Sequence, residues 1–137
     1  MLNTQLSDAE RYPLKIRDMI IMDVPKDRAP MSVEWMPDYK REVKELPNLA
    51  MAGDRYYLYA SHSDTFSEYT GTVMSIDPAG RGKDETGYAV IKMLNGFLYV
   101  RRCGGLPGGY DKDTLVQLAN IAKDEKVNHI IIEANFG

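Results

Sequence analysis

Two carboxylates in this sequence stand where a bound cation is expected. Asp77 directly follows the short apolar run VMSI, and Glu133 directly follows the β-branched run VNHIII. Apolar runs bounded by turn signals predict buried strands, so both acids are expected at the rim of a sheet. An unpaired carboxylate there is costly unless a metal ion, a cation or several N–H donors face it. Oxygen-only ligands suit Mg²⁺ or Mn²⁺, and we therefore interpret Asp77 and Glu133 as candidate metal ligands.

The elements that must position these acids follow one another in residues 71–137. This half of the chain predicts an α/β fold with the order β-β-β-α-β. Strands are expected at residues 73–76, 87–94, 97–102 and 127–132. Asn95 and Gly96 tolerate the positive φ of a type I′ turn, so they predict a hairpin between the second and third strands. The glycine-rich residues 104–109 are expected to form a loop.

A single helix is expected after that loop, from about Asp113, which can cap it. Its apolar residues recur at helical spacing and predict one buried face, made of Leu115, Leu118, Ala119 and Ala122. A crossover helix allows the last strand to lie parallel to the first. If those two strands are neighbours, Asp77 and Glu133 emerge side by side, because adjacent strands lie about 4.8 Å apart. Two such carboxylates, with Asp84 near by, form the skeleton of a two-metal site that cleaves phosphodiesters.

The glycine-rich loop after Asp77 also invites a phosphate-binding interpretation, which its spacing does not support. A Walker A motif needs a glycine where Asp77 stands and a serine or threonine where Asp84 follows Gly82 and Lys83. A dinucleotide fingerprint fails as well, because Gly80 and Gly82 lead into a strand instead of a helix. The plain alternative is a glycine-rich turn with solvated charges, and spacing alone leaves that alternative open.

The first half of the chain predicts an irregular, proline-rich extension. Prolines interrupt a charged sequence through residues 25–50, which is typical of a connector. Brief strands are expected at residues 19–24 and within the segment RYYLYASHS, residues 55–63, and a short helix is expected to begin at Ser7. We therefore expect residues 1–70 to pack loosely on neighbouring bodies.

Composition argues against several classes of protein. The chain is 44% hydrophobic and 27% charged, which argues against wholesale disorder, and its net charge of −3 gives no basic signature of nucleic-acid binding. Any contact with DNA therefore needs a metal or a partner surface to offset the acids. The single cysteine, Cys103, excludes an internal disulfide. No signal peptide and no membrane-spanning run is visible, so we expect a cytosolic protein with no membrane partner.

Several separated segments resemble one viral family. The segments IDPAGRGKDETGYAV, LNGFLYV, GGYDKDTL and IIIEANFG resemble the nuclease domain of the terminase large subunit of short-tailed DNA phages, also called DNA maturase B. The segment LNTQLSDAERYPLK resembles the region that follows the ATPase domain in the same proteins. The resemblance covers most of the chain, is weakest through residues 25–60, and keeps its motifs in order.

This resemblance implies a partial ribonuclease H-like fold with a mixed sheet. Residues 1–70 correspond to the connector after the ATPase domain, and residues 71–137 correspond to the N-terminal half of the nuclease domain. The family's first acid maps onto Asp77 and its second onto Glu133, as catalytic ligands of two Mg²⁺ or Mn²⁺ ions. Asp84 matches the further acid of the pattern D-P-x-G-x-G-x-D-x-T and is expected to support the metal site.

The basic residues of the same loop are expected to meet the substrate. Arg81 and Lys83 are candidate contacts to DNA phosphate, with solvated loop charges as the alternative. Gly80 and Gly82 would let the backbone approach the substrate closely.

The resemblance also implies partners and missing parts. In the family, an ATP-driven motor moves viral DNA into a capsid and an endonuclease cuts the concatemer. No Walker A sequence is present here, and a third catalytic acid is expected beyond Gly137, so we expect a fragment that cleaves DNA poorly or not at all. Its expected partners are double-stranded DNA, the portal protein, the small terminase subunit and the remainder of the large subunit, in the host cytoplasm and transiently at the procapsid.

Two other functions remain open on the sequence. The first is a non-catalytic interaction module that docks on the motor, portal or small subunit, with structural acids. The second is a transposase, resolvase or recombinase on the same fold, which the packaging-like N-terminal segment disfavours.

Overall fold

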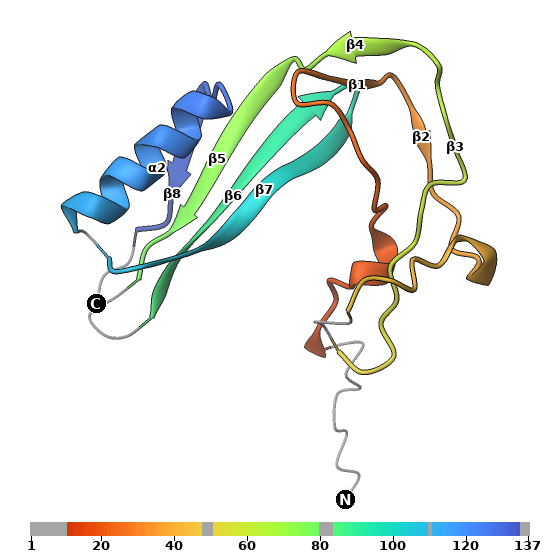
Figure 1. Cartoon of the computed structure of the whole chain (residues 1–137), viewed down its shortest axis with the longest axis horizontal. Coiled ribbons are helices and arrows are strands. Elements are labelled where there is room, and N and C mark those ends of the chain that lie inside the picture. The colour runs from red at the N-terminus through yellow and green to blue at the C-terminus, as the bar shows by residue number, and fades with distance from the viewer. Residues whose placement is uncertain (1–10, 48–50, 80–83, 110, 135–137) are drawn as a thin grey trace, which may run out of the picture. The chain divides into compact units, whose positions relative to one another are not determined.

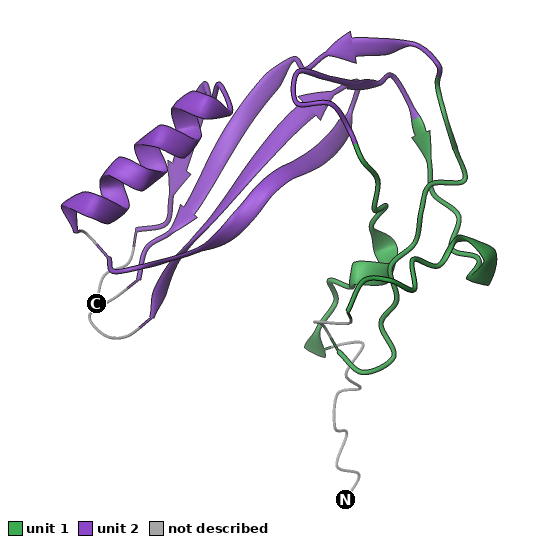
Figure 2. Cartoon of the chain, viewed as in Figure 1, with its two compact units in different colours: residues 1–23, 33–63 green, residues 24–32, 64–137 purple. Residues whose placement is uncertain are grey.

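The chain divides into two compact units, each built from two stretches of sequence (Figure 2). The computed structural model describes residues 11–47, 51–79, 84–109 and 111–134. The first unit holds residues 1–23 and 33–63, and the second holds residues 24–32 and 64–137. The functional division predicted at residue 70 stays a prediction. The helix start expected at Ser7 lies outside the described residues.

Within residues 11–23, 33–47 and 51–63, the first unit contains little regular structure, as its prolines predict. The elements described there are two single-turn 3₁₀ helices and one two-stranded antiparallel sheet: η1 (Ile16–Asp18), η2 (Tyr39–Arg41), β2 (Val33–Glu34) and β3 (Ser61–His62). The strand predicted at residues 19–24 is wrong, because among the described residues that segment makes a single bridge, from Ile20 to Tyr57. The strand predicted within residues 55–63 is confirmed only at its end, where Ser61–His62 form β3. Tyr57 also bridges to Glu42, and neither bridge extends into a continuous ladder.

The second unit is organised around a four-stranded mixed sheet (Figure 1). Its elements are β5 (Gly71–Asp77), β6 (Glu85–Leu94), β7 (Phe97–Pro107), α2 (Lys112–Asp124) and β8 (His129–Ile132). The strand order is β7-β6-β5-β8, with β8 parallel to β5 and the other pairs antiparallel. The predicted order β-β-β-α-β and the parallel pairing of its first and last strands are therefore confirmed. A small antiparallel pair, β1 (Arg28–Pro30) and β4 (Phe66–Glu68), completes the unit.

The hairpin between β6 and β7 follows the prediction at its turn and extends beyond it at its far end. Asn95 and Gly96 adopt φ values of 50° and 81°, as a type I′ turn requires. The loop predicted from residue 104 is wrong, because Gly104 and Gly105 are paired within β7. A Cβ at Gly104 would lie 3.2 Å from the Tyr88 hydroxyl, so glycine there makes room for a side chain instead of ending the strand.

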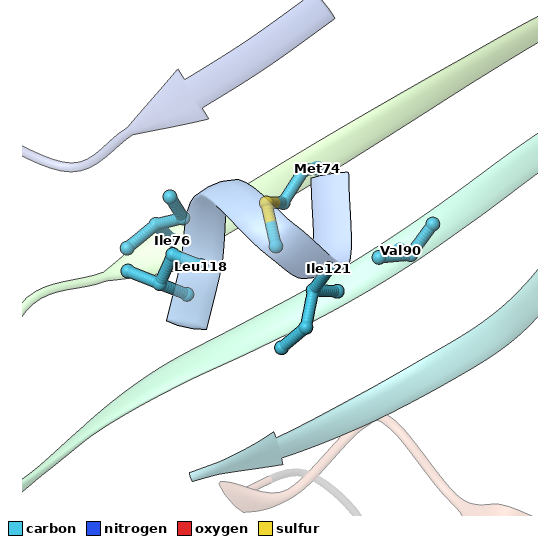
Figure 3. Close-up of a cluster of buried hydrophobic side chains, with 5 residues drawn as sticks. All are labelled: Met74, Ile76, Val90, Leu118 and Ile121. Carbon is cyan, nitrogen blue, oxygen red and sulfur yellow. The ribbon is translucent and has the colours of Figure 1, made fainter. Parts of the chain in front are cut away.

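The core of this unit lies between α2 and one face of the sheet. Figure 3 shows its five buried side chains, which are Met74, Ile76, Val90, Leu118 and Ile121. Burying such side chains contributes about 1.5–3 kcal/mol each, so this cluster fixes which face of the sheet is covered by the helix.

Helix α2 differs in detail from its prediction. It begins at Lys112 with Asp111 at the N-cap position, so the capping role predicted for Asp113 is wrong. Its buried residues are Thr114, Leu118 and Ile121, whereas Leu115 is half exposed. The buried face is rotated from the predicted one because the Thr114 hydroxyl is turned inward, where it donates to the carbonyl of Pro107 at 2.8 Å. In the described part of the chain, no helix has the length and apolar character needed to cross a membrane.

Candidate metal centre

The two predicted acids stand at the same end of neighbouring parallel strands. Asp77 is the last residue of β5, and Glu133 directly follows the last residue of β8. Ile76 pairs with Ile132, and the backbone N–H of Glu133 donates to the carbonyl of Ile76 at 3.1 Å. The ladder therefore carries Glu133 level with Asp77, on strands that lie about 4.8 Å apart.

Alternation along β5 decides on which face of the sheet Asp77 lies. Met74 and Ile76 point into the core under α2. Because successive side chains of a strand point to opposite faces, Asp77 lies on the face away from the helix.

The same alternation applies to β8. Ser75 and Ile131 are cross-strand partners and share the face opposite the helix. Glu133 is two residues beyond Ile131, so its side chain returns to that face. Asp77 and Glu133 thus share one face and one row of the sheet, which is the arrangement that two ligands of one cation need.

Neither acid is engaged as a structural ion pair within residues 11–47, 51–79, 84–109 and 111–134. Both residues are exposed. Two like charges on adjacent strand ends repel each other, and within the described residues no cation offsets that repulsion. The pair is therefore available to bind a cation from solvent.

The other predicted site residues are not gathered with this pair. Asp84 is exposed and precedes β6, and the described residues hold no group of three or more His, Cys, Asp or Glu side chains placed to hold a metal. Arg81, Lys83, Gly80 and Gly82 lie outside the described residues.

Gly87 leaves β6 without a side chain beside Asp77, whereas the Glu85 side chain fills the space over the next glycine in this row, Gly105. Gly87 of β6 is the cross-strand partner of Asp77, and Gly105 of β7 is the partner of Gly87. A Cβ at Gly87 would lie 3.9 Å from the Cβ of Asp77. Sequence reasoning missed this row because Gly105 was expected in a loop. Only the antiparallel register, which the Asn95-Gly96 turn sets, could have revealed it.

The opposite end of the sheet carries a second charged pair, which sequence reasoning did not single out. Lys92 and Glu125 are buried, with the ammonium nitrogen 3.3 Å from a carboxylate oxygen. The same ammonium donates to the carbonyls of Lys26 and Glu125 at 3.1 and 3.0 Å, and it lies over the Tyr69 ring. Burial raises the pKa of the Tyr69 hydroxyl. A polar cavity of about 230 Å³ opens beside Lys92 and Tyr69.

The donor set at Asp77 and Glu133 fits a hard divalent cation. Both candidate ligands offer carboxylate oxygens, and both residues are exposed. Mg²⁺ keeps several waters and is often bound through one or two carboxylates together with substrate phosphates. A pair of acids without a third protein ligand is thus sufficient for such binding.

Two comparisons with known proteins show what this chain is similar to. Residues 76–137 match the family model described as Terminase Bacteriophage T7, Ribonuclease H-like domain. All 137 residues are 46% identical to part of the terminase large subunit of Enterobacteria phage T3. The chain is a relative of the terminase large subunits. It spans 23% of the length of the T3 protein, and its α/β fold with a mixed sheet is ribonuclease H-like.

Proposed function

We propose that this chain contributes the metal-dependent endonuclease site of a terminase large subunit, which cuts concatemeric viral DNA during genome packaging. The observation that carries the proposal is the row shared by Asp77 and Glu133 on neighbouring parallel strands. The likeness to the T3 large subunit and the ribonuclease H-like match support the packaging context.

In this proposal, Asp77 and Glu133 hold Mg²⁺ or Mn²⁺ at the edge of the sheet. A divalent cation bound there supplies Lewis-acid chemistry, which activates a water molecule and neutralises charge on the leaving oxygen. The chain's own contribution is positioning, because the β5–β8 ladder fixes the spacing of the two carboxylates. Gly87 adds no side chain next to Asp77, which leaves room for a phosphodiester beside that carboxylate.

The proposal assigns the other functions partly to the rest of the large subunit and partly to the loop after Asp77. ATP is used by a motor in the rest of the large subunit, and a third acid also comes from there. Arg81 and Lys83 contact DNA phosphate, and Asp84 supports the metal site. The proposed partners are double-stranded DNA, the portal protein and the small terminase subunit, met in the host cytoplasm and at the procapsid.

Calorimetric titration with Mn²⁺ tests the assignment of the two ligands. We expect the unchanged chain to bind Mn²⁺ and both Asp77→Asn and Glu133→Gln to lose that binding. Asp113→Asn is the matched control, since it removes an exposed carboxylate from the start of α2 and should leave Mn²⁺ binding intact. Equal affinity in all four proteins would contradict the assignment.

Plasmid cleavage tests the expected incompleteness of the site. Because the described residues supply a pair of acids and no cluster of three ligands, we expect this chain to cut plasmid DNA poorly or not at all in Mg²⁺. Robust Mg²⁺-dependent cutting that disappears in Asp77→Ala would contradict this expectation.

A non-catalytic interaction module is the second candidate. The absence of a three-ligand group among the described residues is the observation that favours it. Under this alternative, a chain extended through the rest of the nuclease domain would bind no Mn²⁺, whereas the endonuclease proposal predicts tighter binding by the extended chain.

A further inference from the structure

A single buried hydroxyl joins three segments next to Asp77. Thr86, in β6, is 1% exposed. Its hydroxyl oxygen accepts a hydrogen bond from the backbone N–H of Ala79 at 3.0 Å, and the hydroxyl donates to the carbonyl of Gly108 at 3.0 Å. The side chain thereby connects the exit of β5, the start of β6 and the segment after β7.

These bonds hold the chain on both sides of the candidate metal ligand. Ala79 is two residues beyond Asp77, and both Pro78 and Ala79 are buried. Gly87, which follows Thr86 directly, is the cross-strand partner of Asp77. Strand ends fray where few contacts hold them, and here the Thr86 hydroxyl anchors the backbone just where β5 leaves the sheet.

We infer that Thr86 is a positioning residue for the candidate metal centre. Its hydroxyl fixes the backbone that follows Asp77, so that this carboxylate stays level with Glu133. This inference rests on the proposed function. Groups that orient metal ligands without touching the metal typically change metal affinity about 10- to 100-fold when they are removed.

The hydroxyl, and not the bulk of the side chain, carries this role. Thr86→Val keeps the shape but leaves the Ala79 N–H and the Gly108 carbonyl without their side-chain partner. Thr86→Ser keeps the hydroxyl and should restore the function. If side-chain volume mattered instead of the hydroxyl, Thr86→Ser would weaken Mn²⁺ binding more than Thr86→Val does.

Thr114 provides a matched control. It is also a buried threonine, 2% exposed, and its hydroxyl donates to the carbonyl of Pro107. Its hydrogen bond ties α2 to the end of β7, at the residue before Gly108, and is not made to the segment after Asp77. Thr114→Val therefore removes a comparable buried hydrogen bond without releasing the ligand.

The experiment compares Mn²⁺ affinity by calorimetry in the unchanged chain, Thr86→Val, Thr86→Ser and Thr114→Val, each shown to be folded by circular dichroism. We expect Thr86→Val to bind Mn²⁺ at least about tenfold more weakly, with the other two variants close to the unchanged chain. If Thr86→Val does not fold, Thr86→Cys takes its place with the same expectation, because a thiol is only a weak donor and acceptor. Equal affinities in all variants, or an equal loss in Thr114→Val, would overturn the inference.

A metal-free measurement separates this inference from the proposed function. The carboxylate carbon-13 NMR signal of Asp77 should move in Thr86→Val and stay in place in Thr86→Ser and Thr114→Val. An unmoved signal in Thr86→Val overturns the positioning role whether or not the chain binds Mn²⁺. An unchanged chain that binds no Mn²⁺ but shows the moved signal overturns only the proposed metal centre.

Discussion

The two ends of the four-stranded sheet carry different kinds of charged pair. At one end Lys92 and Glu125 are buried and form an ion pair, and the Lys92 ammonium also donates to the Glu125 backbone carbonyl. At the other end Asp77 and Glu133 are exposed and lie on the same face of adjacent strands. The first pair brings opposite charges together, and the second brings like charges together.

This difference indicates which pair is structural. The Lys92 ammonium donates to two backbone carbonyls, pairs with a carboxylate and lies over an aromatic ring, so its interactions are satisfied within the unit. Asp77 and Glu133 have no comparable partner in the described part of the chain, and like charges on neighbouring strand ends are generally unfavourable. A bound cation is the simplest factor that would make the arrangement favourable.

The largest expected effect comes from breaking the structural pair. Lys92→Met leaves the Glu125 carboxylate buried without its cation, and we expect a loss of about 3–5 kcal/mol in the free energy of unfolding. Urea unfolding measures it. Replacing Glu125 by methionine as well should recover much of that loss, since an apolar pair leaves no buried charge. A single-variant cost below about 1 kcal/mol would mean that the pair is no more structural than a surface salt bridge.

Removing a charge from the acid pair should have a much smaller effect on stability. Asp77→Asn removes one of two like charges and no hydrogen bond or ion pair to the described residues, so we expect the free energy of unfolding without metal to change by less than about 0.5 kcal/mol. Thermal unfolding in the presence of a chelator measures this. A loss of more than about 2 kcal/mol would show that Asp77 is a structural residue and would erase the contrast between the two ends.

The smallest effect is expected at the surface near Lys92. A hydrogen bond and charge from Lys26 hold the pKa of the Asp124 carboxyl below its ordinary value. The stability that this contributes is present above the ordinary pKa of an aspartate and is lost as the pH falls through the lowered one. Lys26→Met should raise the pKa of Asp124 toward the ordinary value, as followed by NMR titration, and an unmoved titration would contradict the assignment of cause.

Strand order and the parallel pairing of the acid-bearing strands could be predicted because apolar runs, a strong turn and a crossover helix are local signals. The Asn95-Gly96 turn encodes the hairpin in two residues. The length of β7 could not be predicted, because Gly104 and Gly105 signal a loop until the facing strand is known. The Lys92–Glu125 pair joins positions 33 residues apart, and no local sequence pattern predicts it.

The two acids of the candidate site could be predicted from the sequence, but the hydrogen bonds that hold the backbone around them could not. Asp77 and Glu133 stand out because each follows an apolar run. Thr86 is the last residue of the pattern D-P-x-G-x-G-x-D-x-T, but its structural role could not be predicted, since its two hydrogen bonds reach Ala79 and Gly108, 7 and 22 residues away. Such long-range satisfaction of a buried hydroxyl follows from tertiary packing alone.

The central claim is that Asp77 and Glu133 bind one divalent cation on the face of the sheet opposite α2. A crystal of the chain soaked in Mn²⁺, measured at the manganese absorption edge, tests this claim most directly. We predict an anomalous peak about 2.1 Å from a carboxylate oxygen of each residue. A peak bound by only one of them or elsewhere, or the two carboxylates on opposite faces of the sheet, would contradict the account.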